Sequence, residues 1–132
     1  LLRPQTFMNL SGASVLAARD FYKIPHEQIL ILTDDFALPL GKLRIRPQGT
    51  AGGQKGLADI IKRLGSEQIP RLRIGVGPLP AGWEAADFVL GKFTAAEQPE
   101  IEIQIERAAD AVEHWLAKDL ASMMAKYNPS MP

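Results

Sequence analysis

The stretch that decides the fold is Ile29–Ile61, ILILTDDFALPLGKLRIRPQGTAGGQKGLADII. It begins with four apolar residues, 29–32, a run typical of a strand that is covered on both faces. Asp34 and Asp35 follow almost directly. We therefore expect two acidic side chains at the carboxyl end of this first strand.

The next strand of this stretch carries two arginines. Leu43 and Ile45 alternate with Arg44 and Arg46, which is the period of a half-buried strand. The apolar pair is expected to face the core, so both arginines face solvent or a ligand.

A glycine-rich segment follows and leads into a helix. Four glycines occur in GTAGGQKG, residues 49–56, and apolar residues then recur with helical spacing as far as Gly65, at Leu57, Ile60, Ile61 and Leu64. Such a loop can hold a phosphate through backbone N–H groups, but these glycines match neither of the common nucleotide-binding patterns. A structural turn is an equally good interpretation.

Further elements are expected on both sides of this stretch. Ser11 can cap a helix that Pro25 ends, and the alternating residues 71–77 predict a strand. Residues 78–82 are expected to form a loop, and residues 88–90 a short extended segment. Strands and helices interleave along the chain, which is the pattern of an α/β sandwich.

A long helix is expected near the carboxyl end. Thr94 and Glu97 form a capping-box pattern, and one buried helix face is expected to contain Ile101, Ile105, Ala108, Ala109, Val112, Trp115 and Leu116. Residues 118–132 can add one short helix. The start, Leu1-Leu2-Arg3-Pro4, resembles the end of a buried strand, so we expect the chain to begin inside its domain.

Composition places the chain among ordinary globular proteins. Its 132 residues are 46% hydrophobic and 23% charged, and they include no cysteine, which agrees with a reducing compartment. No apolar run is long enough to predict a membrane span. Basic and acidic residues both number 15, but the middle of the chain is basic, with Lys42, Arg44, Arg46, Lys55, Lys62, Arg63, Arg71 and Arg73 against Asp59 and Glu67.

The residues taken singly leave their chemistry open. Asp34 and Asp35 fit a solvated turn best, with a metal site or a catalytic carboxylate as alternatives. His26 and His114 fit surface or packing positions, and no hydrolytic triad can be assembled. The arginine-bearing strands fit either phosphate binding or a solvated charged face.

Taken together, five segments resemble the bacterial-type peptidyl-tRNA hydrolase family in order and spacing. They are RPQTFMNLSG at 3–12, TDDFALPLGKLRIR at 33–46, GTAGGQKGLADII at 49–61, RLRIGVG at 71–77 and DFVLGKF at 87–93. The resemblance implies one domain over residues 1–132, a three-layer α/β/α sandwich with a mixed, twisted sheet that lacks its N-terminal strand. It also implies hydrolysis of the ester bond between peptide and tRNA.

The resemblance also implies residue roles. Asn9 is expected to hold the peptide and polarise the ester, and Asp34 to orient a catalytic histidine that the family carries on an N-terminal loop absent from this chain. Substrate-binding residues are expected to be Met8, Gly52, Gly53, Gln54 and Lys55, and tRNA-binding residues Arg44, Arg46 and Arg73. The chain alone is therefore expected to be inactive. The family implies no metal or organic cofactor, a monomer, and a cytoplasmic location with peptidyl-tRNA as partner.

Departures from the family pattern keep an alternative open. Gln54-Lys55 replaces a His-Asn pair, so a cation that cannot accept a hydrogen bond stands where the family has an amide. Thr33 replaces a histidine, and Ala37 an acidic residue. The alternative is a noncatalytic RNA-binding relative resembling organellar splicing factors. A small-ligand α/β domain does not explain the ordered segments.

Overall fold

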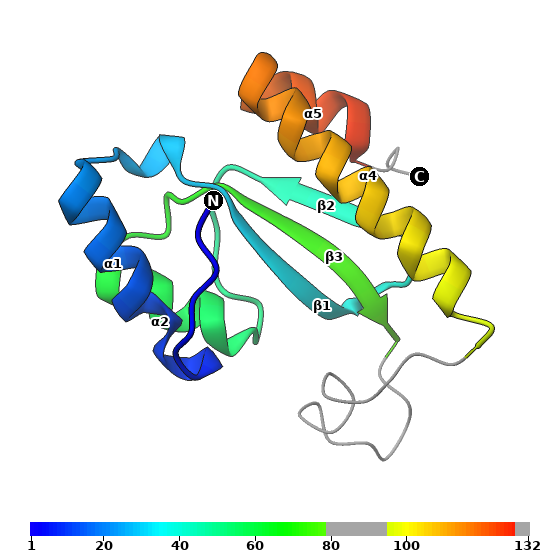
Figure 1. The fold of residues 1–132 in the computed structure, drawn as a ribbon, viewed down its shortest axis with the longest axis horizontal. Helices are drawn as coiled ribbons and strands as arrows, with labels where there is room; N and C mark the ends of the chain where they lie inside the picture. Colours follow the sequence, from blue (N-terminus) through cyan, green and yellow to red (C-terminus); the bar gives the residue numbers. More distant parts are fainter. Residues whose placement is uncertain (79–94, 129–132) are drawn as a thin grey trace. The chain divides into compact units, whose positions relative to one another are not determined.

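The computed structural model describes residues 1–78 and 95–128. They divide into two compact units, unit 1 with Leu1–Thr33 and Arg46–Arg71, and unit 2 with Asp34–Ile45 and Leu72–Pro132. The single domain expected from the sequence stays a prediction. In chain order the elements are η1 (Met8–Leu10), α1 (Ser11–Tyr22), η2 (His26–Gln28), β1 (Ile31–Pro39), β2 (Leu43–Arg46), α2 (Lys55–Leu64), β3 (Arg71–Gly77), α4 (Gln98–Ala117) and α5 (Leu120–Tyr127) (Figure 1).

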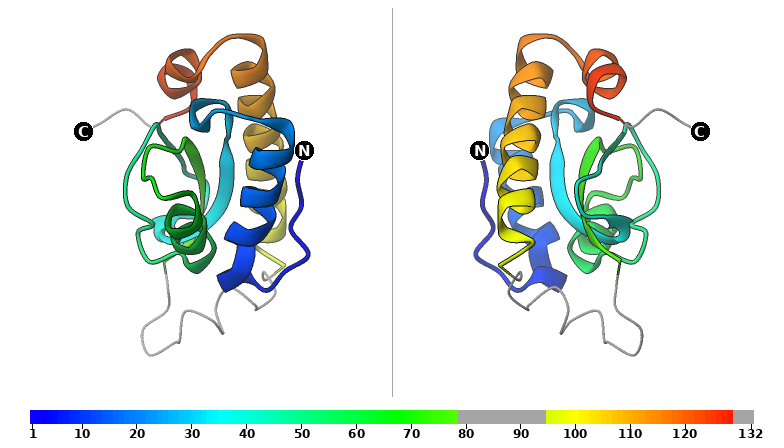
Figure 2. Two further views of the ribbon diagram at one scale, coloured as in Figure 1. Left: turned by 90° about the vertical axis from the view of Figure 1, so that its left-hand side faces the viewer. Right: turned by 90° about the vertical axis from the view of Figure 1, so that its right-hand side faces the viewer.

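Unit 1 is built on the close packing of α1 and α2, which lie side by side in Figures 1 and 2. The Gly12 N–H donates to the Asp59 carboxylate at 2.7 Å. A Cβ at Gly12 would lie 2.5 Å from the Asp59 carbonyl oxygen, so only glycine fits at this crossing. The core between the helices contains Val15, Ile60, Leu64 and Ile69.

Helix α2 ends at the glycine that its sequence predicts. Gln54 is the N-cap, and its side-chain oxygen accepts from the Leu57 N–H at 2.7 Å. Gly65 ends the helix in the left-handed conformation, with φ of 70°, which glycine adopts without a steric penalty. The expected apolar face is confirmed, because Leu57, Ile60 and Leu64 are buried.

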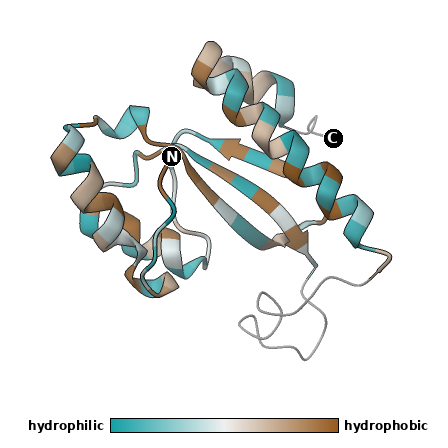
Figure 3. Ribbon diagram, in the orientation of Figure 1, coloured by the Kyte–Doolittle hydropathy of each residue, from teal (hydrophilic) through white to brown (hydrophobic). Residues whose placement is uncertain are grey.

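The sheet is mixed, with strand order β1-β3-β2. Strands β1 and β3 run in parallel, because backbone bonds join Ile31 to Pro70 at their starts and Leu40 to Gly77 at their ends. The chain reverses after β1, so β2 runs antiparallel to β3 (Figure 1). Hydrophobic and hydrophilic residues alternate along β2 and β3 (Figure 3). The α/β class with a mixed sheet is therefore confirmed.

Two glycines of β3 allow β1 to approach closely. A Cβ on Gly75 would clash with the backbone carbonyl of Pro39, and one on Gly77 would clash with that of Phe36. The RLRIGVG segment thus fixes the spacing between the two strands as well as forming a strand itself.

Helix α4 lies along the sheet within unit 2 (Figures 1 and 2), and its anchor is a glutamine. The Gln104 side chain, 1% exposed, accepts from the Gly41 N–H at 2.9 Å and donates to the carbonyls of Lys42 and Gly75, both at 2.9 Å. The predicted helix face is partly wrong, because Ile105, Ala109 and Leu116 are exposed. The buried positions are Ile101, Gln104, Ala108 and Ala111.

Helix α5 confirms the expected short terminal helix, and its end is joined to β2. The Asn128 side chain accepts from the Ile45 N–H at 2.6 Å and donates to the Ile45 carbonyl at 3.1 Å. These two bonds reproduce what a neighbouring strand would offer to Ile45.

Both predicted capping residues are wrong. Helix α1 begins at Ser11 with Leu10 as N-cap, because the η1 turn comes directly before it, and the Ser11 hydroxyl donates to the Met8 carbonyl at 2.7 Å instead. Helix α4 begins at Gln98 with Glu97 as N-cap, so Glu97 does not occupy the third helical position that a capping box requires. Four earlier predictions lie outside the described residues: Thr94 as a cap, the part of the loop 78–82 beyond Pro78, the extended segment 88–90, and the family segment 87–93.

Candidate functional site

Unit 1 brings together two of the predicted substrate-binding residues. The Gln54 amide nitrogen lies 3.6 Å from the Met8 sulfur, and a Cβ at Gly56 would lie 2.6 Å from that sulfur. The Gln54 oxygen is already used to cap α2, so its NH2 group faces Met8. The start of α2 and the η1 turn therefore form one surface.

Asn9 lies on the same surface, in η1 beside Met8. Its side chain is exposed, and within residues 1–78 and 95–128 it makes no hydrogen bond. The bond from Ser11 to the Met8 carbonyl holds the turn that carries it. An amide presented on a fixed turn in this way can donate to a ligand carbonyl.

The glycine-rich loop continues this surface. Gly52 and Gly53 are exposed and have φ values of 60° and 88°, a region that other residues rarely occupy. Lys55, the first residue of α2, is also exposed. Met8, Asn9, Gly52, Gly53, Gln54 and Lys55, the residues of this surface, form a candidate substrate surface, called the substrate surface below. All six come from unit 1.

A buried arginine holds the start of this loop. Arg71 is fully buried, and its guanidinium donates to the carbonyls of Ile69 at 2.8 Å, Thr50 at 2.7 Å and Glu67 at 3.1 Å. The Gly49 N–H donates to the same Glu67 carbonyl at 3.1 Å. The sequence placed Arg71 in a basic region and at the start of a strand, so its structural role was missed.

The two aspartates lie within β1, so the expected position at the end of a strand is wrong. Strand β1 continues to Pro39, because Asp35 finds partners inside the sheet: Arg73 of β3 at 3.6 Å and the N–H of Ala37 at 2.9 Å. Asp34 is half-buried and also interacts with other groups of the chain. The strand is not covered on both faces either, since Leu32 is exposed.

The structure places two predicted tRNA-binding arginines on neighbouring strands. The Gly75 N–H donates to the Lys42 carbonyl at 2.9 Å, and two residues further along antiparallel strands Arg44 lies opposite Arg73. Asp35 offsets the charge of Arg73, whereas no acidic partner of Arg44 is found among the described residues. The alternation in β2 is confirmed, because Leu43 and Ile45 are buried and Arg44 and Arg46 are half-buried.

Neither histidine lies in a position suited to a catalytic base. A ring nitrogen of His26 lies 3.0 Å from the Arg19 guanidinium. The Nε2 atom of His114 is buried, has no hydrogen-bond partner in the described part of the chain, and its ring lies 6.0 Å from that of Tyr127. Over residues 1–78 and 95–128 there is no metal-binding group of three or more acidic or histidine side chains, and no helix that could cross a membrane.

The fold and this surface define an α/β protein with an exposed amide and a glycine-rich loop as its candidate ligand site. The family model for peptidyl-tRNA hydrolase matches residues 1–132. The chain is 51% identical to the peptidyl-tRNA hydrolase of Rhodopirellula baltica, covering 97% of this chain and 67% of the relative. It is 46% identical to the peptidyl-tRNA hydrolase of Chloroflexus aurantiacus, covering 98% of this chain and 69% of that relative.

A solved structure agrees with these relatives. The crystal structure of peptidyl-tRNA hydrolase from Acinetobacter baumannii superposes with a TM-score of 0.85 at 33% identity, covering 96% of this chain and 66% of that one. This chain belongs to the peptidyl-tRNA hydrolase family. It spans about two thirds of the length of these relatives.

Proposed function

We propose that this chain carries the substrate surface and an orienting carboxylate of a peptidyl-tRNA hydrolase. The reaction is hydrolysis of the ester between a peptide and the terminal ribose of tRNA. The family match over residues 1–132 carries the proposal, and the grouping of Met8, Asn9 and Gln54 supports it. The protein acts in the cytoplasm as a monomer, on peptidyl-tRNA, and needs no metal or organic cofactor.

The reaction requires a general base, a carboxylate that orients this base, and a hydrogen-bond donor to the carbonyl oxygen of the ester. A histidine takes a proton from water, and the water oxygen attacks the ester carbonyl. Asn9 donates to the carbonyl oxygen as negative charge develops on it, and Asp34 holds the histidine in the correct tautomer. The carbon–oxygen bond to ribose then breaks, and the ribose oxygen takes up the proton.

The base in this proposal is not among residues 1–132, because His26 and His114 are engaged or buried elsewhere. The chain alone is therefore expected to show no hydrolysis of peptidyl-tRNA. Activity is expected in a hybrid in which the N-terminal residues of the Rhodopirellula baltica relative precede Leu1. Turnover by residues 1–132 alone at the rate of the hybrid would show that the base has been assigned wrongly.

The role of Asn9 can be tested in the same hybrid. Asn9→Ala removes one donor to the carbonyl oxygen, and a loss of roughly 10²- to 10³-fold in kcat is expected. Binding of deacylated tRNA should stay unchanged. If tRNA binding falls while kcat is unaffected, the surface binds RNA without performing catalysis, which would favour the RNA-binding alternative that Lys55 suggests.

The two neighbouring aspartates provide a matched comparison. Asp34→Asn should lower the rate strongly, by up to ~10⁴-fold if the coupling resembles that of serine proteases. Asp35→Asn should mainly weaken the contact with Arg73 and change the rate little. Equal, mild effects on kcat would mean that Asp34 does not orient the base.

A further inference from the structure

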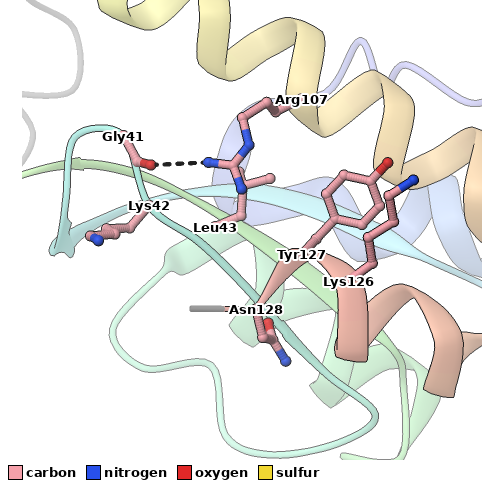
Figure 4. Close-up of a pocket in the computed structure, with 7 residues that line it drawn as sticks. All are labelled: Gly41, Lys42, Leu43, Arg107, Lys126, Tyr127 and Asn128. Carbon is pink, nitrogen blue, oxygen red and sulfur yellow. Dashed lines mark hydrogen bonds between the residues drawn. The ribbon is translucent and has the colours of Figure 1, made fainter. Parts of the chain in front are cut away.

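A small polar hollow opens in unit 2 beside β2. Its volume is about 130 Å³, and its lining is formed by Gly41, Lys42, Leu43, Arg107, Lys126, Tyr127 and Asn128 (Figure 4). Three of these residues are cationic and none is acidic. They come from the turn before β2, from the start of β2, from α4, and from α5 and its C-cap. We call it the basic hollow.

The walls of the basic hollow are tied to one another. Gln104 joins α4 to the turn through its bonds to Gly41 and Lys42, and to β3 through its bond to Gly75. Asn128 joins the end of α5 to β2 through both backbone groups of Ile45. These bonds hold the backbone segments that carry the cations. A site with fixed walls loses little entropy when it takes a ligand.

Among the described residues, the two helix cations have no acidic partner. Arg107 makes one long contact, 3.4 Å to the Gly41 carbonyl, and Lys126 lies 5.4 Å from the centre of the Tyr127 ring. Neither forms an ion pair within the described ranges, although α4 is rich in acidic residues. The Glu100 carboxylate lies against Gly41, the residue whose carbonyl Arg107 also contacts, but it forms no ion pair with Arg107 and does not line the basic hollow.

Figure 4 shows how these side chains are directed. Arg107 lies between Gly41 and Tyr127, Lys126 runs beside Tyr127, and Lys42 extends away from Arg107 on the far side of the turn. Lys42 and Arg44 share one side of the chain by the two-residue period. Cations therefore lie on both sides of β2: Arg107 and Lys126 on one, Lys42 and Arg44 on the other.

We propose that Arg107 and Lys126 bind a phosphate group of the tRNA backbone at the basic hollow, separately from the substrate surface. The inference rests on the proposed function. Guanidinium and ammonium groups without carboxylate partners are the groups that recognise phosphate oxygens in proteins. A phosphodiester, unlike an acidic peptide, needs only point charges and a shallow opening, which is what the basic hollow offers. The contact contributes affinity for the body of the tRNA and leaves the ester chemistry unchanged.

The test compares variants that remove equal charge. Arg107→Gln, Lys126→Gln and the double variant are measured against Lys118→Gln, which removes a cation of the same unit outside the basic hollow. Binding of deacylated tRNA is followed over a series of salt concentrations. Each lost phosphate contact should lower the log-log salt slope by about 0.7 to 0.9, and Lys118→Gln should leave it unchanged. Unchanged binding by the double variant at every salt concentration would overturn the proposal.

A second readout separates the basic hollow from the chemistry. In the hybrid, the double variant should raise KM for intact peptidyl-tRNA roughly tenfold. Each single variant should raise it about fivefold or less. It should leave kcat and the hydrolysis of a short peptidyl-oligonucleotide unchanged, because that substrate lacks the tRNA body. An equal loss on both substrates would refute the assignment. If the hybrid hydrolyses neither substrate, the proposed function fails, while the salt series still decides whether the basic hollow binds tRNA.

Discussion

Replacing Arg71 should be among the most destabilising changes in unit 1. Arg71→Met keeps the apolar stem but leaves three carbonyl groups, those of Thr50, Glu67 and Ile69, without their charged donor. A hydrogen bond to a charged group is worth about 1.5–3 kcal/mol. Since the three share one side chain and are not additive, we expect a total loss of about 3–5 kcal/mol. That is a large part of the 5–15 kcal/mol typical of a domain.

Two assays are used: chemical denaturation measures the free energy of unfolding, and hydrogen exchange measures the local opening around the Gly49 amide. Arg71→Lys should recover only part of this lost stability, because one ammonium group cannot reach all three carbonyls that the guanidinium spans. Arg63→Met is the matched control, since the Arg63 side chain is 43% exposed and makes only a 3.6 Å ion pair; its loss should stay below about 1 kcal/mol. The Gly49 amide should exchange faster in Arg71→Met. A loss below about 1 kcal/mol in that variant would refute the reasoning.

Three further changes test other parts of the fold. Gly12→Ala should separate α1 from α2, because its Cβ would lie 2.5 Å from the Asp59 carbonyl; a cost of about 2–4 kcal/mol is expected from denaturation, and an unchanged midpoint would contradict it. Gln104→Leu should cost about 2–4 kcal/mol, because the Gly41 N–H and the Gly75 carbonyl lose their bonds to this side chain, while the Lys42 carbonyl keeps only the bond from the Gly75 N–H; Gln104→Glu should recover only the bond from Gly41. Hydrogen bonding from the Ser122 backbone N–H lowers the pKa of Asp119 below its usual 3.8. The stability that this cap gives to α5 is therefore present above pH 3.8 and is lost as the pH falls through the lowered pKa. An NMR titration of the Asp119 carboxyl with a midpoint at or above 3.8 would contradict this.

The sequence was informative where one local rule governs an element. Helix α2 has a single apolar face, a capping residue and a terminal glycine, and its predicted end at Gly65 is confirmed. The alternation in β2 required only the period of two. The family resemblance implied that Met8 and Gln54 both bind substrate, which stays a prediction, and the structure brings their side chains together.

The sequence was misleading where a distant partner decides the structure. Asp34 and Asp35 predict a turn, because carboxylates are rare inside strands. The Arg73 side chain that pairs with Asp35 is 38 positions further along the chain, so the pairing cannot be seen in the local sequence. Gln104 is polar, so a helix face chosen by hydrophobicity excludes it and includes the exposed Ile105. Hydrogen-bond partners brought together by the fold cannot be read from spacing along the chain.

The pairing of Asn128 with Ile45 has a consequence for self-association. In the order β1-β3-β2 of the described sheet, β2 is an edge strand, and the free backbone groups of an edge can accept a strand from another molecule. Here one amide side chain occupies both the N–H and the carbonyl of Ile45. Any incoming strand at this register must first displace the end of α5, which therefore protects the β2 edge of the described sheet against pairing with a strand of another molecule.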